Sequence, residues 1–276
     1  MVKFLIILSL IFPLPALSSS FSTQYDKIIH QRTSLYRNIL VVDGDGYRCM
    51  TFGRFNGQQS CIDPDKPDTL LFPYYQGLMR STDIANGVNS ILVIGVGGGV
   101  IPLALARHYP SAVVDAVELD KEVVNIARDY FQYRETPNMT TYVDDGRMFV
   151  RKAIRTNKKY DLIVMDAFDK ESIPEHLATQ EFYHQLNQLL TPTGLIATNT
   201  FSTGPQIPHE NATYLAVFQH LYELNVGSNR VLFAFNHGDL AEKMTQGFKH
   251  LHLDTVRSIK PFTDQFAPIN VILCDK

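Results

Sequence analysis

Several features are scarce in this chain of 276 residues: tryptophan is absent, cysteine occurs three times, and only 19% of the residues are charged. Three cysteines are too few for a small disulfide-held scaffold, and 16 glycines and 14 prolines are too few for a collagen-like or low-complexity chain. The formal net charge of -3 argues against an extended polyanion-binding face, so nucleic acid is not expected as a partner. With 45% hydrophobic residues, the chain is expected to be globular, with a sizeable core.

The first twenty residues differ in composition from the rest of the chain. Lys3 precedes an apolar run from Phe4 to Leu17, and small residues follow at 18–20. This order is typical of a secretory signal peptide, and the run is shorter than the ~20 apolar residues that a bilayer span needs. We expect residues 1–20 to be a cleaved signal, with a membrane anchor as the second choice. The mature protein is then expected to be secreted or periplasmic, without stable membrane insertion.

Short strand-like segments joined by glycine turns occupy the region after the N-terminal run. Segments 36–42 and 47–52 flank the turn Asp43-Gly44-Asp45-Gly46, a pattern typical of β-hairpins. We therefore expect a small antiparallel β-domain within residues 21–80. A hairpin could bring Cys49 to Cys61 as a disulfide in an oxidising compartment, but a reduced buried pair fits the sequence equally well.

From residue 90 onward, apolar strand-like runs alternate with helical segments, and no run reaches transmembrane length. Buried parallel strands appear in sequence as continuous apolar runs, and this alternation is typical of βαβ units. We therefore expect residues 81–276 to form a doubly wound, Rossmann-like α/β domain. The expected strands are 90–95, 112–119, 142–143, 162–165 and 195–200, and the expected helices are 100–108, 121–131, 148–155 and 180–190.

In such sheets, ligands bind at the carboxyl ends of the strands. The first expected strand ends in the glycine loop, Gly95-Val96-Gly97-Gly98-Gly99, which permits positive φ angles and close approach of a ligand to a helix N-terminus. The second ends at Glu118, 23 residues after Gly95, a spacing typical of acids that bind ribose hydroxyls. Together these two features predict a nucleoside site.

Acids also follow the next two expected strands. Asp144 and Asp145 precede Gly146, so Asp145 could simply form a turn. Asp166 ends the apolar run 162–165, and an acid at the mouth of a buried sheet is costly unless it is hydrogen-bonded or functional. The nine histidines have no spacing that predicts a ligand set, so no metal is expected.

These motifs resemble those of the spermidine/spermine synthases, the polyamine aminopropyltransferases. The resemblance covers most of the chain after residue 34. It is carried by 34–39, Gln59, 94–99, 117–120, 143–146, the stretch 160–169 and the tail 263–268.

The resemblance implies a Rossmann-like S-adenosylmethionine-dependent transferase fold beneath a small N-terminal antiparallel β-domain. It implies decarboxylated S-adenosylmethionine as co-substrate, a small-molecule amine such as putrescine as acceptor, and a homo-oligomer. At the nucleoside it implies Glu118 on the ribose, Asp145 on the adenine amino group beside Asp144, Gln59 as a helper, and Gly95, Gly97, Gly98 and Gly99 along the thioether. At the amine it implies Asp166 as base or orienting acceptor, Tyr74 beside it, and Asp169 at the entrance.

Four residues in three motifs depart from the family pattern. Gly98 replaces an aspartate that grips the aminopropyl ammonium, Gln76 replaces a glutamate, and Ala167-Phe168 replaces a Ser-Ser/Thr pair. Two alternatives therefore stay open: a methyltransferase that uses intact S-adenosylmethionine, and a noncatalytic protein that binds a nucleoside or polyamine. We expect the segment after Pro174, which includes His176, to form a wall over the amine side.

Overall fold

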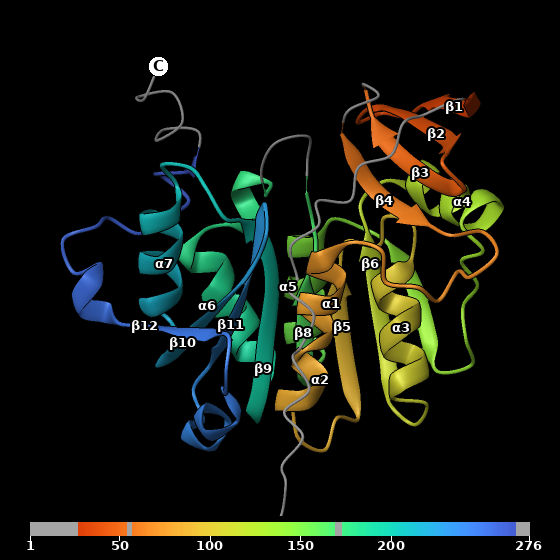
Figure 1. The fold of residues 1–276 in the computed structure, drawn as a ribbon. Helices are drawn as coiled ribbons and strands as arrows, with labels where there is room; N and C mark the ends of the chain where they lie inside the picture. The colour runs from red at the N-terminus through yellow and green to blue at the C-terminus, as the bar shows by residue number, and fades with distance from the viewer. Residues whose placement is uncertain (1–26, 54–56, 169–172, 269–276) are drawn as a thin grey trace, which may run out of the picture.

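The computed structural model describes residues 27–53, 57–168 and 173–268, which form two sheets (Figure 1). The expected signal or anchor at 1–20, the entrance residue Asp169 and Cys274 lie outside the described residues. One sheet has four strands in the order β1-β2-β3-β4, and the other has eight in the order β12-β10-β11-β9-β8-β5-β6-β7. Within the described residues, no helix is both long enough and apolar enough to span a bilayer.

The four-stranded sheet is antiparallel throughout. The Asp45-Gly46 turn has φ values of 52° and 81°, the left-handed geometry that tight hairpins require. Cys49 and Cys61 face each other across β3 and β4 and form a disulfide, which decides between the two states that the sequence left open. Strand β1 was not expected, because its residues are exposed or half-buried and do not alternate in polarity. The strands are β1 (Lys27–Thr33), β2 (Asn38–Gly44), β3 (Tyr47–Phe52) and β4 (Gln58–Ile62).

The centre of the large sheet is parallel, with helices on both faces (Figure 1). Along β5, Ile91 and Val93 join one buried apolar cluster while Leu92 and Ile94 join another, so the sheet is covered on both sides. The parallel strands are β5 (Ser90–Ile94), β6 (Val113–Glu118), β7 (Met139–Val143), β8 (Tyr160–Met165) and β9 (Leu190–Phe201). The helices between them are α3 (Val100–His108), α4 (Lys121–Tyr130), α5 (Gly146–Arg155) and α6 (Gln180–Leu189).

Antiparallel strands extend the large sheet beyond β9, a region for which the sequence analysis gave no elements. These are β10 (His220–Val226), β11 (Asn229–Phe235) and β12 (Phe248–Leu251), with α7 (Ile207–Leu215) and the 3-10 turns η2 (Gly238–Lys243) and η3 (Leu253–Thr255). Helix α1 (Pro73–Met79), followed by α2 (Ser81–Ile84), packs on the same sheet. A Cβ at Gly77 would lie 2.9 Å from Val231 and 3.1 Å from Val226, which shows how closely α1 approaches.

The small sheet is attached to the large domain next to the end of β6. Ser34 Oγ donates to Asp120 Oδ2 at 2.5 Å, and Arg32 forms an ion pair with Glu122 at 3.0 Å. Asp120 also caps α4 by accepting from the backbone N–H of Glu122. The small sheet is therefore fixed two residues beyond Glu118, beside the expected nucleoside site.

Candidate active site

The strand order β8-β5-β6-β7 brings the expected site residues to one edge of the sheet. The glycine loop follows β5, Glu118 ends β6, Asp144 and Asp145 follow β7, and Asp166 follows β8. Carboxyl ends of adjacent parallel strands form the crevice in which doubly wound folds bind ligands. The rule that ligands bind at the carboxyl ends of the strands and the observed strand order thus indicate the same edge of the sheet.

The glycine loop requires glycine at its two ends. Gly95 has a φ of 98°, and a Cβ there would overlap the backbone carbonyl of Asp166. Gly99 has a φ of 83°, and a Cβ there would overlap the ring of Tyr133. Residues with a side chain rarely adopt such φ angles, and a side chain at either position would have no space. The loop is therefore packed against β8 on one side and against the segment after α4 on the other.

Glu118 binds the glycine loop directly. Its Oε2 accepts from the backbone N–H groups of Val96 at 3.0 Å and Gly97 at 3.4 Å, and its Oε1 accepts from the N–H of Asp120 at 3.1 Å. Each carboxylate oxygen has two lone pairs, so these bonds leave acceptor capacity for ribose hydroxyls. Glu118 therefore fixes the loop, and its ribose role stays a prediction.

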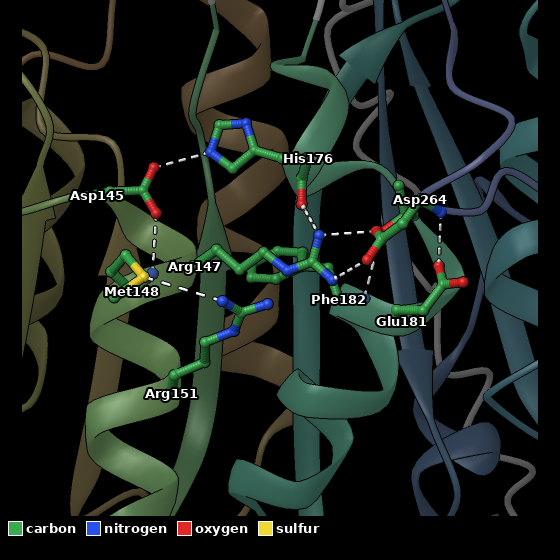
Figure 2. Close-up of polar contacts among 9 residues, drawn as sticks. Asp145, Arg147, Met148, Arg151, His176, Glu181, Phe182 and Asp264 are labelled. Carbon is green, nitrogen blue, oxygen red and sulfur yellow. Dashed lines mark hydrogen bonds and ion pairs between the residues drawn. The ribbon is translucent and has the colours of Figure 1, made fainter.

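The two acids after β7 have protein partners. Asp145 is the N-cap of α5: its Oδ1 accepts from the N–H of Met148 at 2.8 Å. Its Oδ2 lies 2.8 Å from His176 Nε2 (Figure 2). Asp144 forms an ion pair with Lys152 at 2.6 Å. Capping explains the presence of Asp145 without a ligand, and its adenine role stays a prediction.

Asp166 is the group with the most unusual chemistry at this edge. Burial raises the pKa of its carboxyl to about 7, and the negative charge of Glu118 acts in the same direction. Asn199 opposes the rise by donating from Nδ2 to Asp166 Oδ1 at 2.9 Å. Asn229 Nδ2 in turn donates to the side-chain oxygen Oδ1 of Asn199 at 3.0 Å, which fixes the orientation of the Asn199 amide. A carboxyl with a pKa near neutrality is suited to accept and release a proton.

Two tyrosines of α1 lie beside Asp166. Tyr74 OH donates to the backbone carbonyl of Gln59 at 3.4 Å, and Tyr75 OH is 2.8 Å from Ser60 Oγ. Burial, with a further contribution from the Asp166 charge, raises the pKa of both phenols, so both stay protonated. The Gln59 side chain itself donates from Nε2 to the carbonyl oxygen of Gly57 at 3.5 Å.

Hydroxyl and aromatic groups fill the space around Gly98. A Cβ at this position would lie 2.6 Å from Ser60 Oγ and 3.0 Å from the Phe131 ring. Behind Gly98, a cavity of about 330 Å³ lies between α3 and the segment after β4. Gln76, the other neutral replacement, is exposed and donates to the carbonyl of Leu70 at 3.1 Å. Neither position therefore offers a carboxylate to a cationic ligand.

Sequence reasoning missed Ser60, Tyr75, Asn199 and Asn229. Asn199 lies in β9, the next strand after β8 in the sheet, so a search for polar residues near every strand end would have found it. Ser60 and Tyr75 come from segments outside the parallel strands and give no such signal. Among the described residues, no group of three or more His, Cys, Asp or Glu side chains is arranged to hold a metal ion.

Comparison with known proteins identifies the family. The spermine/spermidine synthase domain matches residues 74–225. A polyamine aminopropyltransferase from Vibrio vulnificus is 34% identical, over 93% of this chain and 95% of the relative. The eEF1A lysine and N-terminal methyltransferase of Bos taurus is 27% identical, over 54% of this chain and 23% of its own length.

A solved structure confirms the expected fold. Spermidine synthase from Thermotoga maritima superposes with a TM-score of 0.66 at 19% identity, covering 88% of this chain and 84% of that chain. The family domain spans more than half of the chain, and the Vibrio relative matches nearly all of it. The chain therefore belongs to the spermine/spermidine synthase family.

Proposed function

We propose that the protein is a spermidine synthase-like aminopropyltransferase, which moves the aminopropyl group of decarboxylated S-adenosylmethionine to a polyamine such as putrescine. One observation carries the proposal: Asp166, with its pKa near 7, lies against the glycine loop at the site edge. The 34% identity to a polyamine aminopropyltransferase over nearly the full length supports the same reaction class. The enzyme is thus a transferase of polyamine biosynthesis.

The donor half of the site follows from the glycine loop and β6. Glu118 would accept hydrogen bonds from the ribose hydroxyls, and Asp145 would accept one from the adenine amino group. The backbone of the glycine loop would pass along the thioether portion. These contacts would hold the donor so that its reactive carbon faces Asp166.

The transfer itself is an in-line displacement. The acceptor nitrogen forms a bond to the carbon beside the sulfonium, the C–S bond breaks, and its electron pair stays on sulfur, which releases methylthioadenosine. Amines of this kind have a pKa near ~10.4, so one proton must leave before attack. Asp166 would take that proton, or orient the amine that has lost it, with the Tyr74 phenol beside it. Because the sulfonium is already activated, positioning supplies the remaining acceleration.

The second candidate is methyl transfer from intact S-adenosylmethionine. The neutral surroundings of Gly98 favour it, because Ser60 and Tyr75 present hydroxyls rather than a carboxylate to the end of the donor. A donor that keeps its own carboxylate would meet no repulsion from these groups. The similarity to a methyltransferase over 54% of the chain is consistent with this alternative.

Donor preference distinguishes the candidates. The experiment measures calorimetric binding of methylthioadenosine, decarboxylated S-adenosylmethionine and S-adenosylmethionine to the full chain, then analyses products with putrescine. Tighter binding of the decarboxylated donor, with spermidine formed, is the expected result. Preference for the intact donor would replace the proposal with methyl transfer. Binding without turnover would leave a noncatalytic nucleoside-binding protein.

We further propose that the protein works outside the cytoplasm and as a homo-oligomer. The apolar run of residues 4–17 and the Cys49–Cys61 disulfide support an oxidising compartment. Oligomerisation rests on family analogy alone. N-terminal sequencing of secreted protein, which we expect to begin near residue 21, and light scattering test the two statements.

A further inference from the structure

The C-terminal segment reaches the start of α5 through a paired charge. Both Asp264 carboxylate oxygens accept from Arg147, from Nη1 and Nη2, each at 2.7 Å (Figure 2). Thr179, the N-cap of α6, adds a hydroxyl donor at 2.7 Å. The Arg147 guanidinium and the Thr179 hydroxyl hold the pKa of Asp264 below its usual value, so the pair stays ionised. Arg147 is only 8% exposed, so its charge has lost most of its hydration.

The same arginine also holds the backbone of the short turn η1 (Glu175–Leu177). Arg147 Nη1 donates to the carbonyl oxygen of His176 at 3.2 Å. The imidazole of His176 then extends to Asp145, with 2.8 Å between Nε2 and Oδ2. Figure 2 shows the resulting series of contacts, which runs from Asp264 through Arg147 and His176 to Asp145. The sequence predicts His176 on the amine side, whereas the structure places it against Asp145, the residue expected at the adenine.

This arrangement fixes an acceptor at the rim of the site. Asp145 is held by the N–H of Met148 on one oxygen and by His176 on the other, so its carboxylate cannot rotate freely. Each oxygen keeps a lone pair for a further donor. The His176 side chain is 44% exposed and Asp145 29%, so a ligand can reach both.

Structural stabilisation alone is a weak explanation for the buried charge. Only the arginine is buried, because the Asp264 side chain is 44% exposed, and an ion pair with a solvent-exposed partner contributes little net stability. Arg147 nevertheless uses three hydrogen bonds to join a tail segment and an exposed turn to the first turn of α5. Such an arrangement is better suited to holding the turn in one position than to strengthening the core.

We propose that His176 is a purine-binding residue of the nucleoside site and that the Arg147–Asp264 pair is its positioning unit. This inference rests on the proposed function, because it takes Asp145 as the acceptor of a purine 6-amino group. His176 Nε2 orients the Asp145 carboxylate, and the imidazole lines the base beside it. The C-terminal segment thereby contributes to recognition of the donor without touching it.

The test compares two nucleosides that differ only at the base. Calorimetry measures the binding of methylthioadenosine and methylthioinosine, whose 6-oxo group cannot donate to Asp145, to the full chain. Wild type is expected to prefer the amino form. His176→Ala should reduce that preference about tenfold, the scale of one hydrogen bond to a charged group, and Asp264→Asn should reduce it in the same direction.

Two matched controls separate recognition from stability. His184→Ala removes an exposed histidine of α6, and Asp254→Asn removes an exposed carboxylate in the C-terminal segment. Both should leave the preference unchanged. Equal weakening of both nucleosides in His176→Ala, or no weakening, would overturn the inference while leaving the proposed function intact. Failure of wild type to bind either nucleoside would remove the proposed function and the inference with it.

Discussion

Replacement of Asp166 by asparagine should raise the stability of the fold and lower the turnover of the enzyme. Burial raises the pKa of this carboxyl from its ordinary 3.8 to about 7, so the folded state binds the proton more tightly than the unfolded state does. Stability therefore falls as pH rises from about 4 to 7. Asparagine resembles the protonated acid and keeps an oxygen to accept from Asn199. Asp166→Asn should thus be more stable than wild type, and increasingly so at higher pH.

The magnitude follows from the pKa. The full rise corresponds to roughly 4 kcal/mol, since one pH unit corresponds to about 1.4 kcal/mol. About half of this free energy arises between pH 5 and pH 8. Because the side chain is partly exposed to solvent, that half is reduced by a further factor of about two. The stability difference between the variant and wild type should therefore grow by about 1 kcal/mol over that interval.

Urea denaturation at pH 5 and pH 8 measures this difference, with Asp254→Asn as the exposed control. In parallel, Asp166→Asn should lose turnover by about a hundredfold or more, the scale of general base catalysis, while methylthioadenosine affinity stays nearly unchanged. For wild type, kcat/KM should fall as pH drops below about 7, because the base becomes protonated. A stability difference that does not vary with pH, or equal loss of binding and turnover, would refute the reasoning and make Asp166 a structural residue.

Three further substitutions test neighbouring parts of the molecule. Glu118→Gln should weaken methylthioadenosine binding by about tenfold in calorimetry, since hydrogen bonds to charged groups are the stronger ones; unchanged affinity would remove its ribose role. Gly99→Ala should lower the free energy of unfolding by about 2 kcal/mol or more through backbone strain and overlap with Tyr133. Gly46→Ala is its control, because φ is also positive at Gly46 but no atom lies within 4 Å of the added Cβ. Equal losses of stability in the two variants would show that the Tyr133 ring moves aside. Cys61→Ser should cost about 2–3 kcal/mol in non-reducing urea denaturation, and no loss would mean that the bond does not stabilise the sheet.

The parallel core was predictable because burial on both faces leaves continuous apolar runs. Strand β8 and helix α3 were recognised in this way, close to their observed bounds. Strand β1 lacks that signal: its residues are exposed or half-buried, and its pairing with β2 depends on long-range register. Strand β10 also lacks that signal, because its residues are of mixed polarity and mostly half-buried. Strand β11 is a continuous buried apolar run that the sequence analysis left unassigned.

The residues of the candidate site also fall into a group that the sequence predicts and a group that it does not. Residues at the ends of parallel strands, such as Glu118 and Asp166, follow from one geometric rule and are brought together at one edge. Ser60 and Tyr75 meet only because the small sheet and α1 fold onto that edge. The partner of Arg147 lies 117 residues away in sequence, and no local pattern encodes such a distance.

The close approach of Gly95 to the backbone of Asp166 limits which parts of the site substitutions can change. The two segments extend adjacent hydrogen-bonded strands, and the N–H of Asp166 donates to the carbonyl of Ile94 at 2.8 Å. The spacing between the glycine loop and Asp166 is therefore set by the main chain, at the ~4.8 Å separation of neighbouring strands. Substitutions of side chains around this edge therefore leave the main-chain spacing between the glycine loop and Asp166 unchanged. The side chains at this edge can therefore vary without moving the main chain that carries them.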